Sequence, residues 1–498
     1  MTGLRPHRRA RRRTSLSCFA RVLLPLSFAA ACAAQPLEFP ELAADVPVGE
    51  GRVQPCLEEL PGEIVCGRFR VWEDRAARRG RTLHRAFVRA RATSTAGRQP
   101  DAVTFLFGGP GSSVLEQAAG VVQGFAGLRE RRDLLLVDLR GVGFSAPLDC
   151  DVPYPGGVAS RFGTLFPADH LAACRAELEQ RADLSLYTSN HTMDDLDQLR
   201  AWLGIPQLNF WAGSYGVREV QVFARRHPEA IRSAVLDGAS PITEVSYVTH
   251  ARGLQDALDR IEALCASQSG CARDYPDLSA RIDRLFARLR ESPIELEIGG
   301  AAVRFGAGDL GYALRGLLYR RGGEVPWMVS RAEAGEWRPL VDYYLQRQGW
   351  VGEPGGATGM HLSVLCAEDI APVTDAEVAE QTAGTFLGPH LIDTYRRACD
   401  AWPHAELPAD FWQPVRSPVP ALILSGEHDP VTPPSRGAAL AALMPNSLHV
   451  VVPGAGHGVG GPCIARLTGE LIERADVSGL DPSCVEAPSE HTEFRLLE

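Results

Sequence analysis

Short, predominantly apolar segments recur along the chain, and a turn rich in Gly, Asp or Ser ends each of them. They cover residues 103–107, 134–137, 208–211, 234–236, 421–424 and 448–452. Apolar runs of this length are typical of strands that a parallel sheet buries on both faces. Helical patterns at 194–203 and 217–226 separate some of these runs. The sequence therefore predicts an α/β fold with a mostly parallel, doubly wound sheet.

The hydrophobic pattern changes between residues 243 and 405, where apolar residues recur at helical spacing, as in Leu254, Leu258 and Ile261. We expect this stretch to form a mainly helical cap over the carboxyl ends of the strands. The cap (243–405) would separate a first part of the core (35–242) from a second part (406–498). Residues 64–72 and 84–92 predict strands of an antiparallel leading edge.

Residues 1–34 have the pattern of a secretory signal peptide. Seven arginines precede the apolar run 22–31, and small residues follow it. This run is too short to span a bilayer. We therefore expect export to the periplasm or the cell exterior, cleavage near Ala33 or Ala34, and no transmembrane span. The alternative is a lipoprotein, in which Cys32 carries a lipid anchor.

Charge and composition exclude several classes of function. Loss of the seven leader arginines changes the formal net charge from −10 to about −17. A nucleic-acid partner is not expected, because phosphate binding needs a concentrated basic surface. The sequence contains no lysine, which excludes a Walker-A phosphate site and a pyridoxal Schiff base.

Cysteine use indicates an oxidising compartment. Two of the 12 cysteines lie in the leader, which leaves an even number for the mature chain. No zinc-type Cys/His spacing occurs, and we expect neither a metal nor an organic cofactor. The remaining cysteines fall along the chain as near neighbours, which predicts five local disulfides: Cys56–Cys66, Cys150–Cys174, Cys265–Cys271, Cys366–Cys399 and Cys463–Cys484.

Ser214 stands where a strand pattern meets a helix pattern, in Ala212-Gly213-Ser214-Tyr215-Gly216. A sharp strand-to-helix turn exposes a serine hydroxyl above the sheet, as in the Gly-x-Ser-x-Gly elbow of α/β-hydrolases. Here Ala212 replaces the first glycine. Taken alone, a serine among small residues is more often part of an ordinary turn.

Two downstream residues complete the pattern of a catalytic triad. Asp429 follows the apolar run 421–424, and His457 follows the run 448–452. Ser, Asp, His is the chain order of α/β-hydrolases. Separately, Asp429 could cap a turn and His457 could be a surface residue. Together they predict Ser214 as nucleophile, His457 as general base and Asp429 as the residue that orients the histidine.

A glycine-rich loop, Gly108-Gly109-Pro110-Gly111, follows the run 103–107. Glycines let backbone N–H groups approach a substrate oxygen, so we assign the oxyanion hole to the backbone N–H groups of Gly109 and Tyr215. The alternative, a phosphate-binding loop, lacks both the GxGxxG spacing and a lysine.

These motifs resemble the prolyl aminopeptidase and tripeptidyl aminopeptidase family of α/β-hydrolases. The resemblance also rests on segments 138–145, 235–238, 426–433 and 454–457, and it covers nearly all of the mature chain outside the cap. It implies the α/β-hydrolase fold and a serine exopeptidase, or a related esterase or amidase. One departure is Phe107, where the family commonly has histidine.

An exopeptidase must bind a free ammonium group. Glu368 or Asp369, at the return from cap to core, is the candidate anchor, although both could instead be solvated or pair with arginine. We expect Glu219 to be a solvated helix residue and Asp138 and Arg140 to be structural. The remaining singled-out histidines are expected to serve packing or to lie at the surface: His191, His361, His428 and His449.

Three functions remain open at this point. The first is an aminopeptidase or tripeptidyl peptidase that acts on peptides; for the protein itself we expect a monomer. The second is an esterase or amidase on small molecules, and the third is a silent hydrolase fold used for binding.

Overall fold

The computed structural model describes residues 37–150, 157–348, 357–486 and 493–497. The predicted leader 1–34, with the candidate lipid site Cys32, lies outside the described residues. Residues Leu37–Glu498 form one compact unit, so the boundaries of core and cap remain a prediction.

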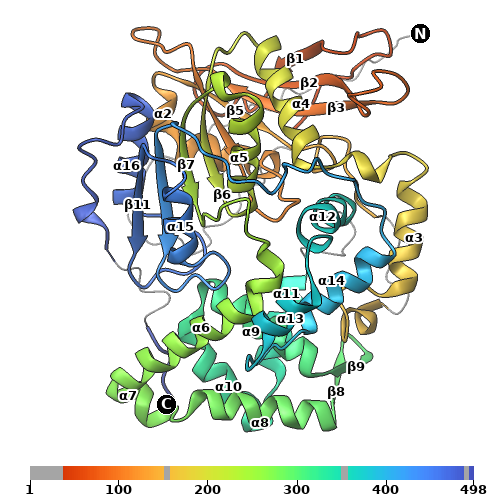
Figure 1. Ribbon diagram of the computed structural model, residues 1–498, viewed down its shortest axis with the longest axis vertical. Helices are drawn as coiled ribbons and strands as arrows, with labels where there is room; N and C mark the ends of the chain where they lie inside the picture. The colour runs from red at the N-terminus through yellow and green to blue at the C-terminus, as the bar shows by residue number, and fades with distance from the viewer. Residues whose placement is uncertain (1–36, 151–156, 349–356, 487–492, 498) are drawn as a thin grey trace, which may run out of the picture. The chain divides into compact units, whose positions relative to one another are not determined.

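Nine strands form one sheet in the described part of the chain (Figure 1). Strands β4, β5, β6, β7, β10 and β11 run parallel to one another, whereas β1, β2 and β3 form an antiparallel edge. The predicted α/β fold with a mostly parallel sheet is confirmed. In spatial order the strands are β1 (Gly51–Pro55), β2 (Ile64–Trp72), β3 (Thr82–Ala90), β5 (Asp133–Val137), β4 (Ala102–Leu106), β6 (Leu208–Gly213), β7 (Ile231–Asp237), β10 (Ala421–Gly426) and β11 (Ser447–Val452).

Helices cover both faces of this sheet. Val103 and Phe105 of β4 belong to a hydrophobic cluster that includes residues of α1, whereas Ala102 and Leu106 belong to one that includes residues of α4 and α5. Successive side chains of a strand point to opposite faces, so two covered faces require the apolar runs of the sequence. The helices of the core are α1 (Ala118–Gly124), α2 (Ala126–Arg129), α3 (Ala168–Leu178), α4 (Ser189–Trp202), α5 (Tyr215–Arg226), α15 (Pro434–Ala441) and α16 (Pro462–Arg474).

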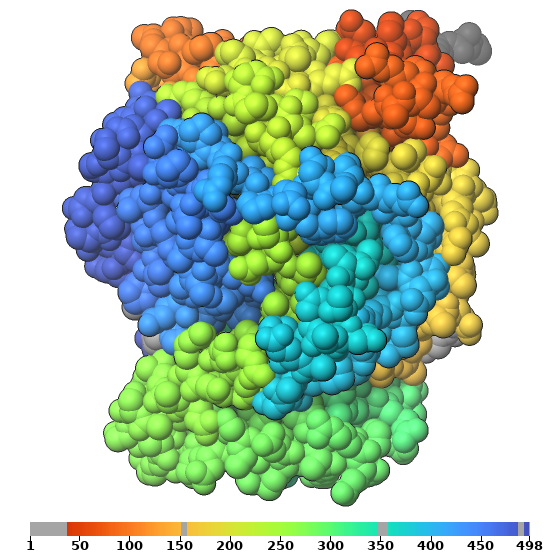
Figure 2. Space-filling view, in the orientation of Figure 1, coloured from red at the N-terminus to blue at the C-terminus, as the bar shows by residue number. Residues whose placement is uncertain are grey.

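Most of the insertion between β7 and β10 is helical, as predicted. Its green segment lies at the lower end of the face in Figure 2, opposite the red and orange amino-terminal strands. The helices are α6 (Ser246–Ser267), α7 (Ser269–Asp274), α8 (Leu278–Glu291), α9 (Ala307–Arg320), α10 (Val325–Glu333), α11 (Arg338–Gln348), α12 (Thr358–Leu365), α13 (Asp375–Thr382) and α14 (His390–Asp400).

The insertion also contains a β-hairpin that the helical pattern did not predict. Strands β8 (Ile294–Ile298) and β9 (Ala301–Phe305) pair antiparallel, and Gly299 and Gly300 form the turn with positive φ values of 58° and 82°. A two-residue turn with both φ angles positive strongly favours glycine. The alternation of apolar and polar residues over 294–298 is the signal that could have predicted it.

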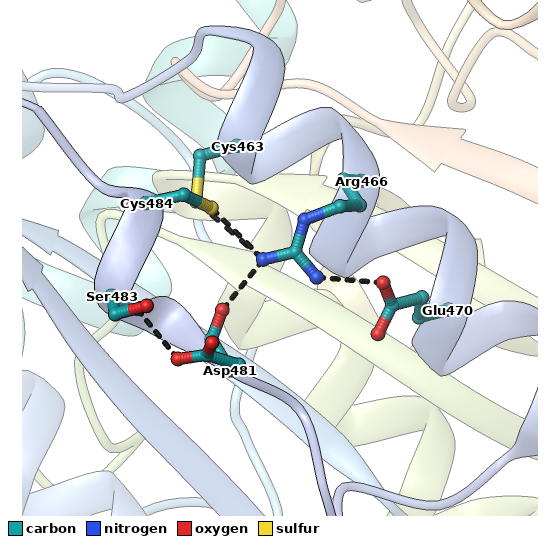
Figure 3. Close-up of a disulfide and its surroundings, with 6 residues drawn as sticks. All are labelled: Cys463, Arg466, Glu470, Asp481, Ser483 and Cys484. Carbon is teal, nitrogen blue, oxygen red and sulfur yellow. Dashed lines mark hydrogen bonds and ion pairs between the residues drawn. A yellow bond between two sulfur atoms is a disulfide. The ribbon is translucent and has the colours of Figure 1, made fainter.

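Disulfides join the same five cysteine pairs that the spacing predicted, with sequence separations of 6 to 33 between partners. Figure 3 shows Cys463–Cys484, which ties the start of α16 to a later turn of the chain. Arg466 of the same helix donates to the carbonyl of Asp481 (2.6 Å) and to Glu470 (2.6 Å). Helix, disulfide and turn therefore brace one another. Among the described residues, we find no helix with the length and apolar character that a membrane span requires.

Candidate active site

Ser214 occupies the turn between β6 and α5 in a left-handed conformation, with φ 56° and ψ −122°. Such a φ is strained for a non-glycine residue, and the turn is held by the Ser214 N–H, which donates to the carbonyl of Asp237 (2.8 Å). A Cβ at Gly108 would lie 2.8 Å from Ser214 Cβ, and one at Gly216 would lie 2.4 Å from the Leu106 carbonyl oxygen. The local sequence thus permits a close strand-to-helix turn with the serine at its apex.

Asp429 and His457 meet beyond the carboxyl ends of β10 and β11. His457 Nδ1 lies 2.8 Å from Asp429 Oδ2. Asp429 also accepts hydrogen bonds from the backbone N–H groups of Val431 and Thr432 (2.9 Å each) and from the Thr432 hydroxyl (2.7 Å). Burial opposes ionisation of Asp429, but His457 and Thr432 together hold the pKa of this carboxyl below its ordinary value. An ionised, fixed carboxylate can orient the imidazole and stabilise its charged form.

Ser214 and His457 line the same cavity. The described residues show no hydrogen bond between the Ser214 hydroxyl and the imidazole; in a structure without substrate, catalytic hydrogen bonds are often long. The three predicted triad members are thus brought to one place by β6, β10 and β11, with β7 between β6 and β10, and by the turns that follow these three strands. Their catalytic roles remain a proposal.

The insertion holds the backbone of His457, which the sequence did not reveal. The His457 N–H donates to the Tyr319 carbonyl (2.7 Å), and Arg320 Nε donates to the His457 carbonyl (2.9 Å). The Tyr319 ring packs edge-on against the imidazole, with 5.1 Å between centroids. The periodic leucines predicted a helix here, but no local signal indicates that its last turn contacts the loop of His457.

The predicted oxyanion loop follows β4 and lines the same cavity at Gly109. Gly109 has a φ of 125°, a conformation that favours glycine. Tyr215 is the first residue of α5, so its N–H has no acceptor within the helix. Phe107 packs edge-on against Trp211, with 6.1 Å between ring centroids. The predicted oxyanion donors are therefore available at the cavity wall, and their role remains a proposal.

A buried carboxylate anchors the far end of this loop. Asp138 accepts hydrogen bonds from the Ser113 hydroxyl (2.8 Å) and from the N–H groups of Val114 (2.9 Å) and Phe144 (3.0 Å). Burial raises the pKa of Asp138 to about 6. Arg140 forms an ion pair with buried Asp195 at 2.9 Å. Both contacts fit the structural roles that we expected for Asp138 and Arg140.

The two candidate ammonium anchors have different surroundings. Glu368 is fully buried, accepts bonds from the Ser189 N–H and hydroxyl (2.7 Å each), and does not line the cavity. Asp369 does line the cavity, where both of its oxygens accept from Arg218 (2.7 and 2.8 Å). Arg218 Nη1 also lies 3.7 Å from Glu368. The structure therefore brings only Asp369 directly to the cavity.

The expectation for Glu219 was wrong. Its side chain is fully buried, and Tyr215 donates to it at 3.3 Å. Burial and the nearby charge of Glu368 raise the pKa of Glu219 to about 8. The helix pattern failed at this position because α5 is covered on nearly every side. The signal that could have predicted this burial is the position of the carboxylate in a central, enclosed helix.

The expected packing histidines are all bonded or packed within the fold. His361 links the oxyanion loop to the insertion, because Nδ1 lies 2.9 Å from the Pro110 carbonyl and Nε2 lies 3.1 Å from the Tyr395 hydroxyl. Burial lowers the pKa of His361 to about 4, so the ring is neutral. His191 and His449 contact the hydroxyl groups of Thr188 and Ser425.

From the sequence we assigned no role to Asp237, although it lies in segment 235–238, one of the segments that resemble the aminopeptidase family. Its carbonyl accepts the Ser214 N–H, and its carboxylate accepts the Val459 N–H at 3.0 Å. Asp237 thus links the nucleophile turn to the loop of His457. Burial raises the pKa of Asp237 to about 6.

The cavity has a volume of about 860 Å³, enough for a short peptide or a small organic molecule. Tyrosine and arginine dominate its charged and aromatic lining, whereas the carboxylates among its described lining residues are Asp237 and Asp369. The described residues contain no cluster of His, Cys, Asp and Glu suited to a metal ion. Its tyrosines and arginines are Tyr215, Tyr247, Tyr312, Tyr319, Tyr343, Tyr395, Arg218, Arg315, Arg320 and Arg321.

Two family models match the chain, one for the alpha/beta hydrolase fold at residues 101–271 and one for TAP-like proteins at residues 372–484. The serine protease Hip1 of Mycobacterium tuberculosis is 27% identical over 430 residues, which cover 78% of this chain and 81% of that protein. The tripeptidyl aminopeptidase of Streptomyces lividans is 25% identical over 461 residues, which cover 85% of this chain and 84% of that protein. With this sheet topology and these matches, the chain has the α/β-hydrolase fold, and its sequence is similar to a serine protease and to tripeptidyl aminopeptidases.

Proposed function

We propose that this protein is an exported serine peptidase that releases residues from the free amino termini of peptides. The observation that carries the proposal is the position of Ser214: a strained, half-buried turn at the wall of a cavity that His457 also lines, with His457 Nδ1 2.8 Å from Asp429 Oδ2. Relatives named as a serine protease and a tripeptidyl aminopeptidase support a peptide substrate.

The proposed reaction is acyl transfer in two steps. His457 accepts the Ser214 proton while the hydroxyl oxygen attacks the scissile carbonyl carbon. The backbone N–H groups of Gly109 and Tyr215 stabilise the oxyanion. The protonated His457 then gives its proton to the leaving amine, and water hydrolyses the acyl-enzyme with His457 again as base.

We propose that Asp369, which lines the cavity, binds the ammonium group of the substrate, and that Glu368, which does not line the cavity, adds negative charge next to it. A carboxylate offers about four acceptor positions, and Asp369 uses three, two for Arg218 and one for the Ser246 N–H (3.2 Å). Burial raises the pKa of Glu368 to about 7 despite Arg218, so above this pH two carboxylates surround one guanidinium. The resulting net negative charge would attract an ammonium group.

The first experiment tests the nucleophile. A fluorophosphonate probe should label the wild-type protein and fail to label Ser214→Ala, whereas Ser267→Ala, an exposed serine on α6, should be labelled normally. Equal labelling of Ser214→Ala would overturn the triad. Absence of labelling in the wild type would favour a silent hydrolase fold used for binding.

The second experiment tests the substrate. Peptide p-nitroanilides with free amino termini should be cleaved, and their N-acetylated counterparts should lose most of the activity. Asp369→Gln should raise KM for peptides with free amino termini. If blocked substrates and short esters are hydrolysed equally well, the protein is a general esterase or amidase, a reading that the occupied oxygens of Asp369 favour.

The proposal that the protein is exported rests on its disulfides. Five disulfides fit an oxidising compartment. Mass spectrometry of the mature amino terminus would distinguish cleavage near Ala33 or Ala34 from lipid attachment at Cys32. An unprocessed chain would contradict both.

A further inference from the structure

Arg315 is a charged residue of the cavity for which the described residues provide no anionic partner. It lies on α9 and lines the cavity, and among the described residues no carboxylate lies within 4.0 Å of its guanidinium group. One amino group donates to the Tyr319 hydroxyl (2.8 Å), whereas Nε is buried without a hydrogen-bond partner. The guanidinium is thus fixed in place but its charge is not balanced.

Two neighbouring arginines have carboxylate partners, whereas Arg320 has none within 4.0 Å among the described residues and donates instead to the His457 carbonyl (2.9 Å). Arg218 pairs with Asp369 at 2.7 Å, and Arg321 pairs with Glu324 at 2.5 Å. Asp369 is therefore already engaged and cannot balance a second guanidinium equally well. The charge of Arg315 remains available to a molecule in the cavity.

Tyrosines surround Arg315, but they cannot supply the missing charge. The guanidinium carbon lies 4.8 Å from the Tyr319 ring centroid and 5.7 Å from that of Tyr312. Burial raises the pKa of Tyr247 and Tyr395, which line the same cavity, so these phenols stay neutral. Arginine is always protonated in proteins, and a desolvated cation without an anion is costly. An anionic ligand would remove that cost.

The position of Arg315 relates this charge to the reaction. Tyr319 lies between Arg315 and the general base His457. The Tyr319 ring centroid is 4.8 Å from the Arg315 guanidinium carbon and 5.1 Å from the His457 ring centroid. The guanidinium therefore lies no more than about 10 Å from the imidazole. An extended peptide spans about 3.3–3.6 Å per residue, so this distance corresponds to roughly three residues.

We propose that Arg315 binds a carboxylate of the substrate, two or three residues from the scissile bond. The proposal rests on the serine-peptidase function above and names its substrate class: peptides with an acidic side chain or a free carboxyl terminus at that distance. Carboxylate suits the site because the planar guanidinium presents several N–H groups in a fixed fork, and Tyr319 fixes one side of it.

The test uses free-amino peptides in matched pairs. In one series a single glutamate is moved along an alanine peptide and compared with glutamine at the same position. In a second series the carboxyl terminus is an acid or an amide. The first series detects an acidic side chain, and the second detects the terminal carboxylate. Products are identified by mass spectrometry, and kcat and KM are measured for each pair.

In the wild type, we expect the carboxylate-bearing member of one pair to have a kcat/KM about 10- to 100-fold higher, mainly through KM, as for hydrogen bonds to charged groups. Arg315→Gln should abolish this preference while the neutral peptide is cleaved at a similar rate. Arg315→Lys should restore part of it. The exposed control Arg338→Gln should behave as the wild type.

Two outcomes overturn the proposal while the peptidase function stands. The wild type could cleave both members of every pair equally, or Arg315→Gln could slow acidic and neutral peptides by the same factor. Fluorophosphonate labelling of Ser214 in every variant shows whether the site is intact. If Arg315→Gln does not fold, two comparisons of the protection of wild-type Ser214 give the answer: Ala-Ala-Glu amide against Ala-Ala-Gln amide, and Ala-Ala-Ala against its amide. A wild type that takes no label and cleaves no peptide refutes the proposed function instead.

Discussion

Replacement of Gly426 by alanine tests whether strand β10 fixes the position of the general base. Gly426 is the last residue of this strand. An added Cβ would lie 2.0 Å from the carbonyl oxygen of Gly456 and 2.6 Å from that of Ala455. Both are backbone atoms of the loop that carries His457, so no side-chain rotation can relieve the contact.

The size of the effect follows from these distances. Separation to 3.0 Å, below which Cβ contacts essentially do not occur, requires a shift of about 1 Å from the 2.0 Å contact. A displacement of about 1 Å in a catalytic group can cost about 100-fold in rate. Overpacking of this kind also destabilises a fold by about 1–3 kcal/mol. We expect Gly426→Ala to lose about 100-fold in kcat and to unfold at lower urea concentration.

The assay combines peptide turnover, the rate constant of fluorophosphonate labelling, and urea unfolding. Gly469→Ala is the matched control, because a Cβ at this helical position in α16 has no atom within 4 Å. The control should keep full activity and gain about 0.5–1 kcal/mol from alanine in a helix. Wild-type activity and stability in Gly426→Ala would refute the reasoning, since the loop of His457 could then move without consequence.

Three further predictions follow from the site and the disulfides. Asp429→Asn should lower kcat by about 10⁴-fold while substrate binding persists, because the imidazole loses its ionised partner; steady-state kinetics measure this, and a loss below 10-fold would contradict the role. Because burial and Glu368 raise the pKa of Glu219 from 4.5 to about 8, the folded protein keeps a proton that the unfolded chain releases. The free energy of unfolding of the wild type should therefore fall relative to that of Glu219→Gln as pH rises from about 5 to 8, by up to about 1.4 kcal/mol per pH unit, and parallel urea-unfolding profiles would refute this. Joint replacement of Cys463 and Cys484 by alanine should cost about 3 kcal/mol, the chain-entropy value for a loop of this length (separation 21), whereas unchanged urea unfolding would show that Arg466 alone holds the turn.

The sequence predicted those parts of the fold whose signals are local. Apolar runs identify β4, β6 and β10 because burial on both faces removes polar residues from them. The turn at Ser214 could be recognised because its tight geometry needs small residues on both sides. The cysteine pairs could be predicted because their partners lie close in the chain.

Long-range contacts could not be predicted in this way. Nothing near Tyr319 indicates that its carbonyl binds the N–H of His457, 138 positions later. Glu219 has ordinary helical neighbours, and its burial comes from the elements that pack around α5, among them α4 and the strands β6 and β7. The lack of an ion pair at Arg315 is a property of the assembled cavity, and no window of sequence contains it.

The order of strands in the sheet also determines when during synthesis the site can form. Strand β7 pairs with β10, although the whole insertion separates them along the chain. A nascent chain that ends before β10 contains Ser214 and the glycine-rich loop 108–111 but neither Asp429 nor His457. Pairing across such a separation closes a long loop and is slow compared with local folding. If the proposed triad is correct, we therefore expect activity to be among the last properties that the growing chain acquires.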